Sequence, residues 1–188
     1  MTLTNMLVPT FSQMLATLSD WLAKAEAQIS GGEAEALLSA RLAPDMFPLS
    51  TQIRFACVQP QEAVSRLTGQ AYPATVGAML EEGRHAAERP GSIAQAQARI
   101  AETLALLGSL APDALDVDPA STIIHALPNG MTFDLTAERY ARDWCLAQFY
   151  FHVMIAYAIL RSHNVAIGKA DYIPHLLPYL RVEAAPKG

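Results

Sequence analysis

The feature that most constrains the fold is the run from Trp144 to Leu160, which reads WCLAQFYFHVMIAYAIL. Nearly all of its residues are aromatic, aliphatic or small, and its strongly polar side chains are those of Gln148 and His152. A helix that is apolar on every side must be surrounded by protein or by lipid. Gln148 and His152 are four residues apart and therefore lie on one helical face. The run predicts a polar island inside a helical bundle, where chemistry is to be sought first.

The same run raises the alternative of a membrane span. A helix that crosses a bilayer needs about 20 apolar residues, whereas this run is shorter, stands alone in the chain and carries polar side chains near its middle. Polar groups are costly within the bilayer. We therefore expect a buried helix and no membrane partner. The N-terminal segment MTLTNMLVPTFSQMLATLSDWL lacks a basic start, so it is not expected to be a signal peptide.

The amino-acid composition limits the kinds of partner that the chain can bind. Charged residues make up only 16% of it and apolar residues 52%, whereas soluble domains usually carry about a quarter charged residues. This shortfall predicts extensive burial that includes a subunit interface, and hence a soluble homodimer. The net charge of −5 argues against a nucleic-acid partner, which would require a basic surface.

The two cysteines, Cys57 and Cys145, stand in apolar helical runs and form neither a CxxC motif nor a zinc spacing. We expect them to be buried free thiols in a reducing cytoplasm, with a disulfide or a nucleophilic role as the alternative. The chain also lacks a glycine-rich phosphate loop, a GxSxG elbow, an HExxH motif and a Ser-xx-Lys motif. Most recognisable enzyme classes are thereby excluded.

Apolar periodicity and capping residues predict four long helices and a short one. The second long helix contains Pro60, which predicts a kink before it. Segment 69–91 is rich in glycine and proline and gives no clear prediction as a whole, although AMLEEGRHAAE within it favours two or three helical turns. The expected helices are 10–29, 33–40, 49–67, 92–107 and 136–162.

Two short β-prone runs flank Pro128-Asn129-Gly130, and Asn-Gly is a strong hairpin signal. We expect a small hairpin just before the last long helix, and an irregular, proline-containing tail over about 168–188. The sequence thus predicts one all-α domain over residues 1–188, a four-helix bundle with a small β-hairpin insertion.

Two segments, FYFHVMIAYAILRSHNVAIGKADYI and LAPDMFPLSTQIRFA, resemble the DUF1993 family of uncharacterised bacterial proteins. The resemblance extends over residues 5–175 and implies a four-helix bundle of the DinB/YfiT-like type. One departure is visible: the family tends to show Pro-Asn shortly before its aromatic-Phe-His, where this chain has Leu146-Ala147-Gln148.

The resemblance also bears on metals, because the DinB-like superfamily often binds a divalent ion through three histidines, two of them in an HxxxH on the last helix. His152 falls on the second of these positions and Gln148 on the first, and the helix 49–67 contains no histidine. Glutamine is a poor ligand for zinc or nickel. We therefore expect no metal and no cofactor.

His152 has three readings: a buried neutral imidazole with a hydrogen-bond partner, a ligand-binding or acid–base group, or a metal ligand. Its expected neighbours are Gln148 on the same helix and Gln52 or Asp45 from the second helix and the loop before it. These four residues form the candidate ligand-binding site.

Two functions are carried forward. The first is a cytoplasmic, dimeric bundle protein that binds a small molecule near His152. The alternative is a metal-dependent transferase or hydrolase of the DinB-like type. Whether the chain is an enzyme is left open by the sequence.

Overall fold

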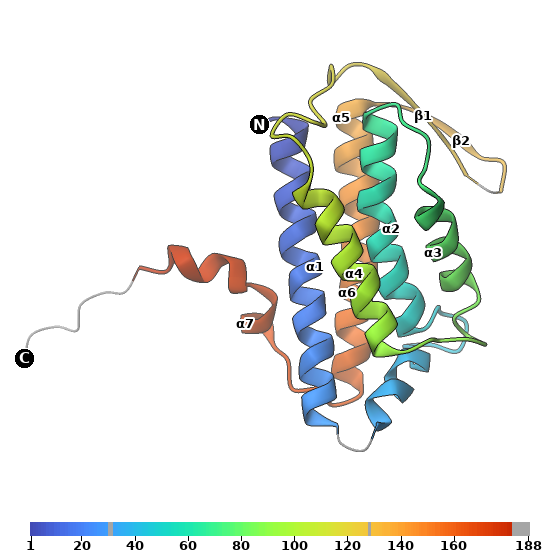
Figure 1. Cartoon of the computed structure of the whole chain (residues 1–188), viewed down its shortest axis with the longest axis vertical. Coiled ribbons are helices and arrows are strands. Elements are labelled where there is room, and N and C mark those ends of the chain that lie inside the picture. The colour runs from blue at the N-terminus through green and yellow to red at the C-terminus, as the bar shows by residue number, and fades with distance from the viewer. Residues whose placement is uncertain (30–31, 128, 182–188) are drawn as a thin grey trace, which may run out of the picture.

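A computed structural model describes residues 1–29, 32–127 and 129–181. Its longest helices are α1, α2, α4 and a last helix that runs without a break through α5, η2 and α6; together they form a bundle (Figure 1). The all-α bundle with a hairpin before the last long helix is thus confirmed. The elements in order are α1 (Leu3–Gln28), η1 (Glu33–Ser39), α2 (Leu49–Leu67), α3 (Ala74–Arg84), α4 (Ile93–Gly108), β1 (Thr122–Ala126), β2 (Thr132–Thr136), α5 (Ala137–Arg139), η2 (Tyr140–Leu146), α6 (Ala147–Ser162), α7 (Lys169–Tyr172) and η3 (Pro174–Tyr179).

Helix α1 begins earlier than the sequence predicted. The helix starts at Leu3, and the hydroxyl of Thr2 accepts a hydrogen bond from the Asn5 amide. Pro9 therefore lies inside the helix, where it removes one backbone donor. Leu3 and Leu7 are buried and continue the apolar stripe into the first two turns. Their burial outweighs the lost hydrogen bond, which is why the start predicted at Thr10 was wrong.

The segment without a clear prediction contains α3, which packs along α2. Gly83 near its end lies so close to the Phe55 ring that a Cβ there would collide with the ring. Glycine permits this close approach of two helices. Pro60 lies within α2, which continues through it to Leu67, and the kink before it stays a prediction. The predicted helix 33–40 is a 3-10 helix, η1.

The last long helix begins where the sequence placed it, since the Thr136 hydroxyl accepts a hydrogen bond from the Arg139 amide. Its second element, η2, is a π-helix, which the sequence did not predict. Such wider turns are rare and are frequent at functional sites. The helix then continues as α6 to Ser162.

Strands β1 and β2 pair in antiparallel register from Thr122 opposite Thr136 to Ala126 opposite Thr132. The hairpin lies across one end of the bundle (Figure 1). Gly130 in its turn has a φ of +87°, as the Asn-Gly signal predicts. Pro128 lies outside the described residues. So do Ser30 and Gly31, which the sequence predicts to end the first helix, and Pro186 of the tail.

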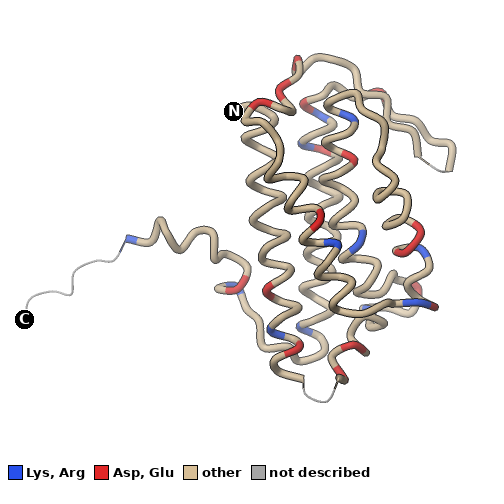
Figure 2. Tube along the Cα trace, in the orientation of Figure 1, with Lys and Arg blue, Asp and Glu red and all other residues tan. Residues whose placement is uncertain are grey.

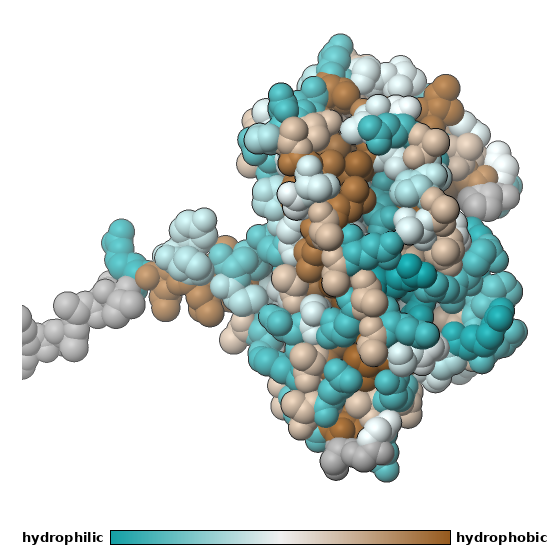
Figure 3. Space-filling view, in the orientation of Figure 1, coloured by the Kyte–Doolittle hydropathy of each residue, from teal (hydrophilic) through white to brown (hydrophobic). Residues whose placement is uncertain are grey.

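The tail is less irregular than expected, because it forms α7 and η3. The Trp21 indole donates to the Asp171 carbonyl over 3.0 Å, and Lys24 pairs with the Asp171 carboxylate. Beyond this anchor the chain leaves the bundle and exposes apolar side chains (Figures 1 and 3). Acidic and basic residues are interspersed along the rest of the molecule (Figure 2).

Candidate functional site

His152 lies on the inner side of α6, with 8% of its surface exposed. Its Nδ1 is 2.9 Å from Oε1 of Gln52, a residue of α2 that is 2% exposed. The hydrogen bond joins two helices through residues that are 100 positions apart in the chain. This pair is the polar island of the bundle.

The orientation of Gln52 determines which ring nitrogen of His152 carries the proton. The Gln52 Nε2 donates to the Phe47 carbonyl over 3.2 Å, so its Oε1 is the atom that faces the imidazole. An amide oxygen only accepts hydrogen bonds, and Nδ1 must therefore donate. The neutral ring then carries its lone pair on Nε2. The network thus assigns one tautomer to His152.

Burial also sets the charge of this ring. Removal from water disfavours the imidazolium, which lowers the pKa of His152 to about 4. His152 is therefore neutral at pH 7. Its free Nε2 can accept a hydrogen bond or a proton.

Three phenylalanines surround the pair and are called here the aromatic lip: Phe47, Phe55 and Phe151. The rings of Phe55 and Phe151 have their centroids 5.3 and 5.4 Å from that of His152. Phe47 packs edge-on against Phe55, and both Phe47 and Phe151 remain about half exposed. The approach to His152 is therefore apolar and aromatic.

The other two candidate residues lie further out. Gln148 is half-buried, one turn before His152, and makes no hydrogen bond to another described residue. Asp45 is exposed in the loop before α2, and neither a hydrogen bond nor an ion pair joins it to another described residue. Gln52, rather than Asp45, is the polar neighbour of His152. A ligand-binding role for the four residues stays a prediction.

The donor atoms do not fit the metal site that the superfamily implies. Among residues 1–29, 32–127 and 129–181, no three histidine, cysteine or acidic side chains are grouped so that they could hold an ion. At the island itself, His152 offers one nitrogen and its neighbours Gln52 and Gln148 offer amides. Transition metals prefer imidazole or thiolate ligands over amides. The side chains at the island therefore do not form the ligand set of a transition-metal site.

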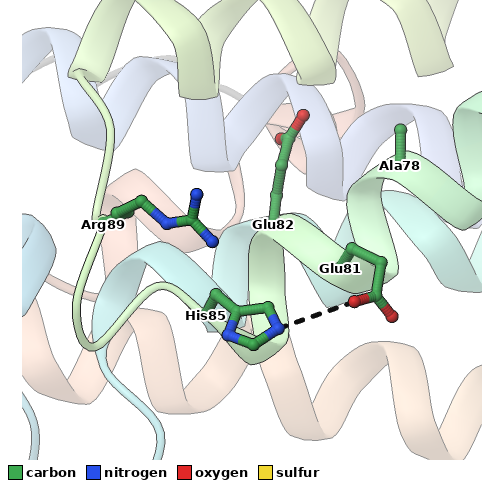
Figure 4. Close-up of a pocket in the computed structure, with 5 residues that line it drawn as sticks. All are labelled: Ala78, Glu81, Glu82, His85 and Arg89. Atoms are coloured by element: carbon green, nitrogen blue, oxygen red, sulfur yellow. Dashed lines mark ion pairs between the residues drawn. The ribbon is translucent and has the colours of Figure 1, made fainter.

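A separate cavity of about 450 Å³ lies at the end of α3, between Ala78, Glu81, Glu82, His85 and Arg89 (Figure 4). His85 pairs with Glu81 over 3.6 Å, and both are largely exposed. Glu82 pairs with Arg99 and with the buried Arg54, and these guanidinium groups lower its pKa. The charge of Glu82 is thus already compensated by two arginines. This cavity is therefore a solvated surface beside a structural ion network.

One group of buried polar residues was missed by the sequence reasoning. His125 is 2% exposed on the inner face of β1, beside Tyr140 and Trp144 of η2. The signal was the alternation in Thr122–Ala126, which puts Ile123 and His125 on one face of the strand. The sequence predicts the hairpin, but it does not predict that this face of β1 is buried against the last helix.

The chain is similar to known proteins over most of its length. The family model described as a domain of unknown function, DUF1993, matches residues 3–173. A solved structure, that of a DinB family member protein from Shewanella denitrificans, is 32% identical, with a TM-score of 0.72 and 91% of each chain covered. No curated protein matches the chain. Both similarities confirm the resemblance that two segments of the sequence indicated.

Proposed function

Because the chain belongs to the DUF1993 family, whose very description leaves its function open, we propose a function from the site itself: a dimeric helical-bundle protein that binds a small molecule at His152. The observation that carries the proposal is the His152–Gln52 hydrogen bond, with the Gln52 amide held in turn by Phe47. A buried side chain oriented by a second one is pre-organised for binding.

The chemistry of the site defines the class of ligand. Nε2 of His152 accepts a hydrogen bond, and the aromatic lip offers apolar surface beside it. The matching ligand has a hydroxyl or N–H donor on an apolar or aromatic body. Binding is favoured over base catalysis, because an efficient general base has a pKa near the working pH and that of His152 is lowered to about 4.

Phenol is a direct probe of this site, since it carries one donor on an aromatic ring. Titration with phenol, followed by the ¹⁵N chemical shift of His152 Nε2, is expected to show a saturable change. Anisole has the same ring without the donor and serves as the control. An equal response to anisole, or no response to phenol, would contradict the proposal. The alternative function, a metal-dependent transferase or hydrolase, would instead show a stoichiometric transition metal that is lost in His152→Ala.

The outer face of α6 is the proposed subunit interface. Ala147, Met154 and Ala158 follow one another at helical spacing, are exposed or half-buried, and carry no charge. A two-fold interface places one patch against its own copy, so an uncharged apolar stripe is self-complementary. This stripe supports the proposal that a second copy of the chain covers it.

By length and composition, Ala137–Ser162 would also be able to cross a membrane, although 39% of its most apolar window is buried in the protein. Its inner face packs in the bundle core and contains the His152–Gln52 pair. A protein partner therefore suits the outer face better than lipid, which would require this helix to leave the bundle.

Sedimentation velocity at micromolar concentrations without detergent tests the interface. The wild-type protein is expected to be a dimer and Met154→Lys a monomer, because the new charges would face each other across the two-fold axis. Ala101→Lys adds the same charge at an exposed position of α4 and should remain dimeric. A monomeric wild-type protein, or a protein found only with lipid vesicles, would overturn the proposal.

A further inference from the structure

Buried polar atoms without a partner are concentrated at one place in the molecule. Among the described residues, six buried side-chain nitrogens and oxygens lack a hydrogen-bond partner. Five of these six belong to four side chains: Nε of Arg66, Nδ1 and Nε2 of His125, the hydroxyl of Tyr140 and Nε1 of Trp144. Buried polar groups are nearly always paired, and an unpaired one costs about 1–3 kcal/mol. Their gathering at one place therefore points to a bound molecule.

Three of the four side chains, those of His125, Tyr140 and Trp144, pack together beneath β1. The His125 ring has its centroid 4.2 Å from that of Trp144 and 5.5 Å from that of Tyr140. Arg66 reaches the same strand, since its Nη1 donates to the Ile124 carbonyl over 2.9 Å. Three elements thus contribute to the cluster: α2, β1 and the π-helix η2. It is called here the hairpin cluster.

Donors outnumber acceptors in the hairpin cluster. Arg66 Nε and Trp144 Nε1 can only donate, the Tyr140 hydroxyl can donate, and neutral His125 donates from one nitrogen and accepts at the other. Arg66 also forms no ion pair with another described residue. An occupant that satisfies these groups must be rich in acceptors and carry negative charge.

Arg66 also lines an open cavity of about 500 Å³ together with Ser65, Gln70, Tyr72 and Ile123. This volume is typical of small-molecule sites. The guanidinium lies over the Tyr72 ring, 5.1 Å from its centroid. The cavity therefore offers an apolar wall from Tyr72 and Ile123 that ends at a cation.

The acidic groups around Arg66 limit the charge of the occupant. Burial raises the pKa of Cys145 and of Tyr72 to about 12 and also raises that of Tyr140, so these groups are neutral at pH 7. The carboxyl of Glu62, one turn before Arg66 on α2, interacts with the charge of that arginine, and burial raises the pKa of Glu62 as well. A single arginine beside a carboxyl and the carbonyl end of α2 suits a monoanion better than a doubly charged phosphate.

We propose that the hairpin cluster binds a small organic carboxylate. Its carboxylate oxygens accept hydrogen bonds from Arg66 Nε, the Tyr140 hydroxyl and the Trp144 indole, and its apolar body lies along Tyr72 and Ile123 in the cavity. This site is separate from the one at His152, so either proposal can fail without the other.

Benzoate is the probe, and benzamide, which has the same ring and no charge, is its control. The ¹H–¹⁵N spectrum of the protein contains two indole signals, from Trp21 and Trp144. Benzoate is expected to move the Trp144 signal saturably and to leave that of Trp21, whose N–H is bound to Asp171, in place. Benzamide is expected to move neither.

Two arginine variants separate a specific contact from general charge. Arg66→Gln is expected to weaken benzoate binding about tenfold or more, because it removes a charge-assisted contact. Arg139→Gln removes the same charge from an exposed position of α5 and should bind like the wild type. Since Arg66→Gln also removes the bond to β1, its fold is checked by circular dichroism.

Tyr140→Phe keeps the proposal testable if Arg66→Gln does not fold, since it removes only an unpaired hydroxyl. It is expected to weaken benzoate binding roughly two- to tenfold. Three results would overturn the proposal. They are no shift of the Trp144 signal with benzoate, equal shifts with benzamide, or an affinity for benzoate that is unchanged in Tyr140→Phe and, where that variant folds, in Arg66→Gln.

Discussion

His152 and His125 are both buried histidines, and burial lowers the pKa of each to about 4, with the charge of Arg66 contributing at His125. Their surroundings differ. His152 has its Nδ1 paired with Gln52 across two helices, whereas neither nitrogen of His125 has a partner among the described residues. The first ring is thus held by one hydrogen bond and keeps Nε2 as a free acceptor, whereas the second is held by none. Burial alone therefore does not show what a histidine can bind; the hydrogen bonds that each ring nitrogen makes or lacks do.

Acid gives the strongest test of the property that the two histidines share, which is burial in the neutral form. In the unfolded chain both imidazoles take up a proton near pH 6.5, while in the folded protein they stay neutral down to about pH 4. The unfolded state thus binds more protons in this window, and stability is lost as the pH falls from about 6.5 to about 4, by up to ~1.4 kcal/mol per pH unit for each histidine. Urea unfolding at a series of pH values measures this loss.

Carboxyl groups also take up protons in acid, so variants must isolate the contribution of the histidines. His125→Phe is expected to remove one share of the acid destabilisation, and the double variant His152→Leu/Gln52→Leu the other. A pH dependence identical to that of the wild type in both variants would show that these rings are not buried as described.

Removing the hydrogen-bond partner of His152 tests how much the bond to Gln52 stabilises the fold. Gln52→Leu leaves Nδ1 of His152 and the Phe47 carbonyl without their partner, so we expect a loss of about 1–3 kcal/mol in the free energy of unfolding. The double variant Gln52→Leu/His152→Leu removes both polar groups and should recover most of that loss. A single variant as stable as the wild type would mean that the hydrogen bond contributes nothing.

Tyr140→Phe tests the unpaired groups around His125 and should have the smallest effect on stability. The Tyr140 hydroxyl is fully buried and has no partner in the described chain, so its removal is expected to change the free energy of unfolding by less than ~1 kcal/mol, or to stabilise the protein. Thermal unfolding of the ligand-free protein measures this. A larger loss would reveal a partner within the protein and weaken the case for the hairpin cluster.

The sequence predicted the parts that depend on local pattern. Apolar periodicity located the long helices, and the four-residue spacing of Gln148 and His152 put the imidazole on the inner face of the last helix. The spacing did not predict how deeply each of the two side chains is buried, since Gln148 stays half-buried. Helical spacing gives a face, whereas depth depends on the neighbouring helix.

The parts that escaped prediction depend on contacts between distant segments. Arg66 and His125 are 59 positions apart by their numbers, and nothing in either neighbourhood shows that a strand lies over the end of α2. The π-helix η2 was also missed, because its residues have the composition of an ordinary helix. The glycine at position 83 is explained only once Phe55 is seen against it.

The π-helical turn has a consequence for the rotation of the last helix. An α-helix advances about 100° per residue, and a π-turn accommodates roughly one residue more than an α-turn in the same stretch. The segment Tyr140–Leu146 therefore acts as an angular offset between the face that meets the hairpin and the face that meets α2. If these seven residues formed an ordinary α-helix instead, His152 would be turned by about a quarter of a revolution away from Gln52.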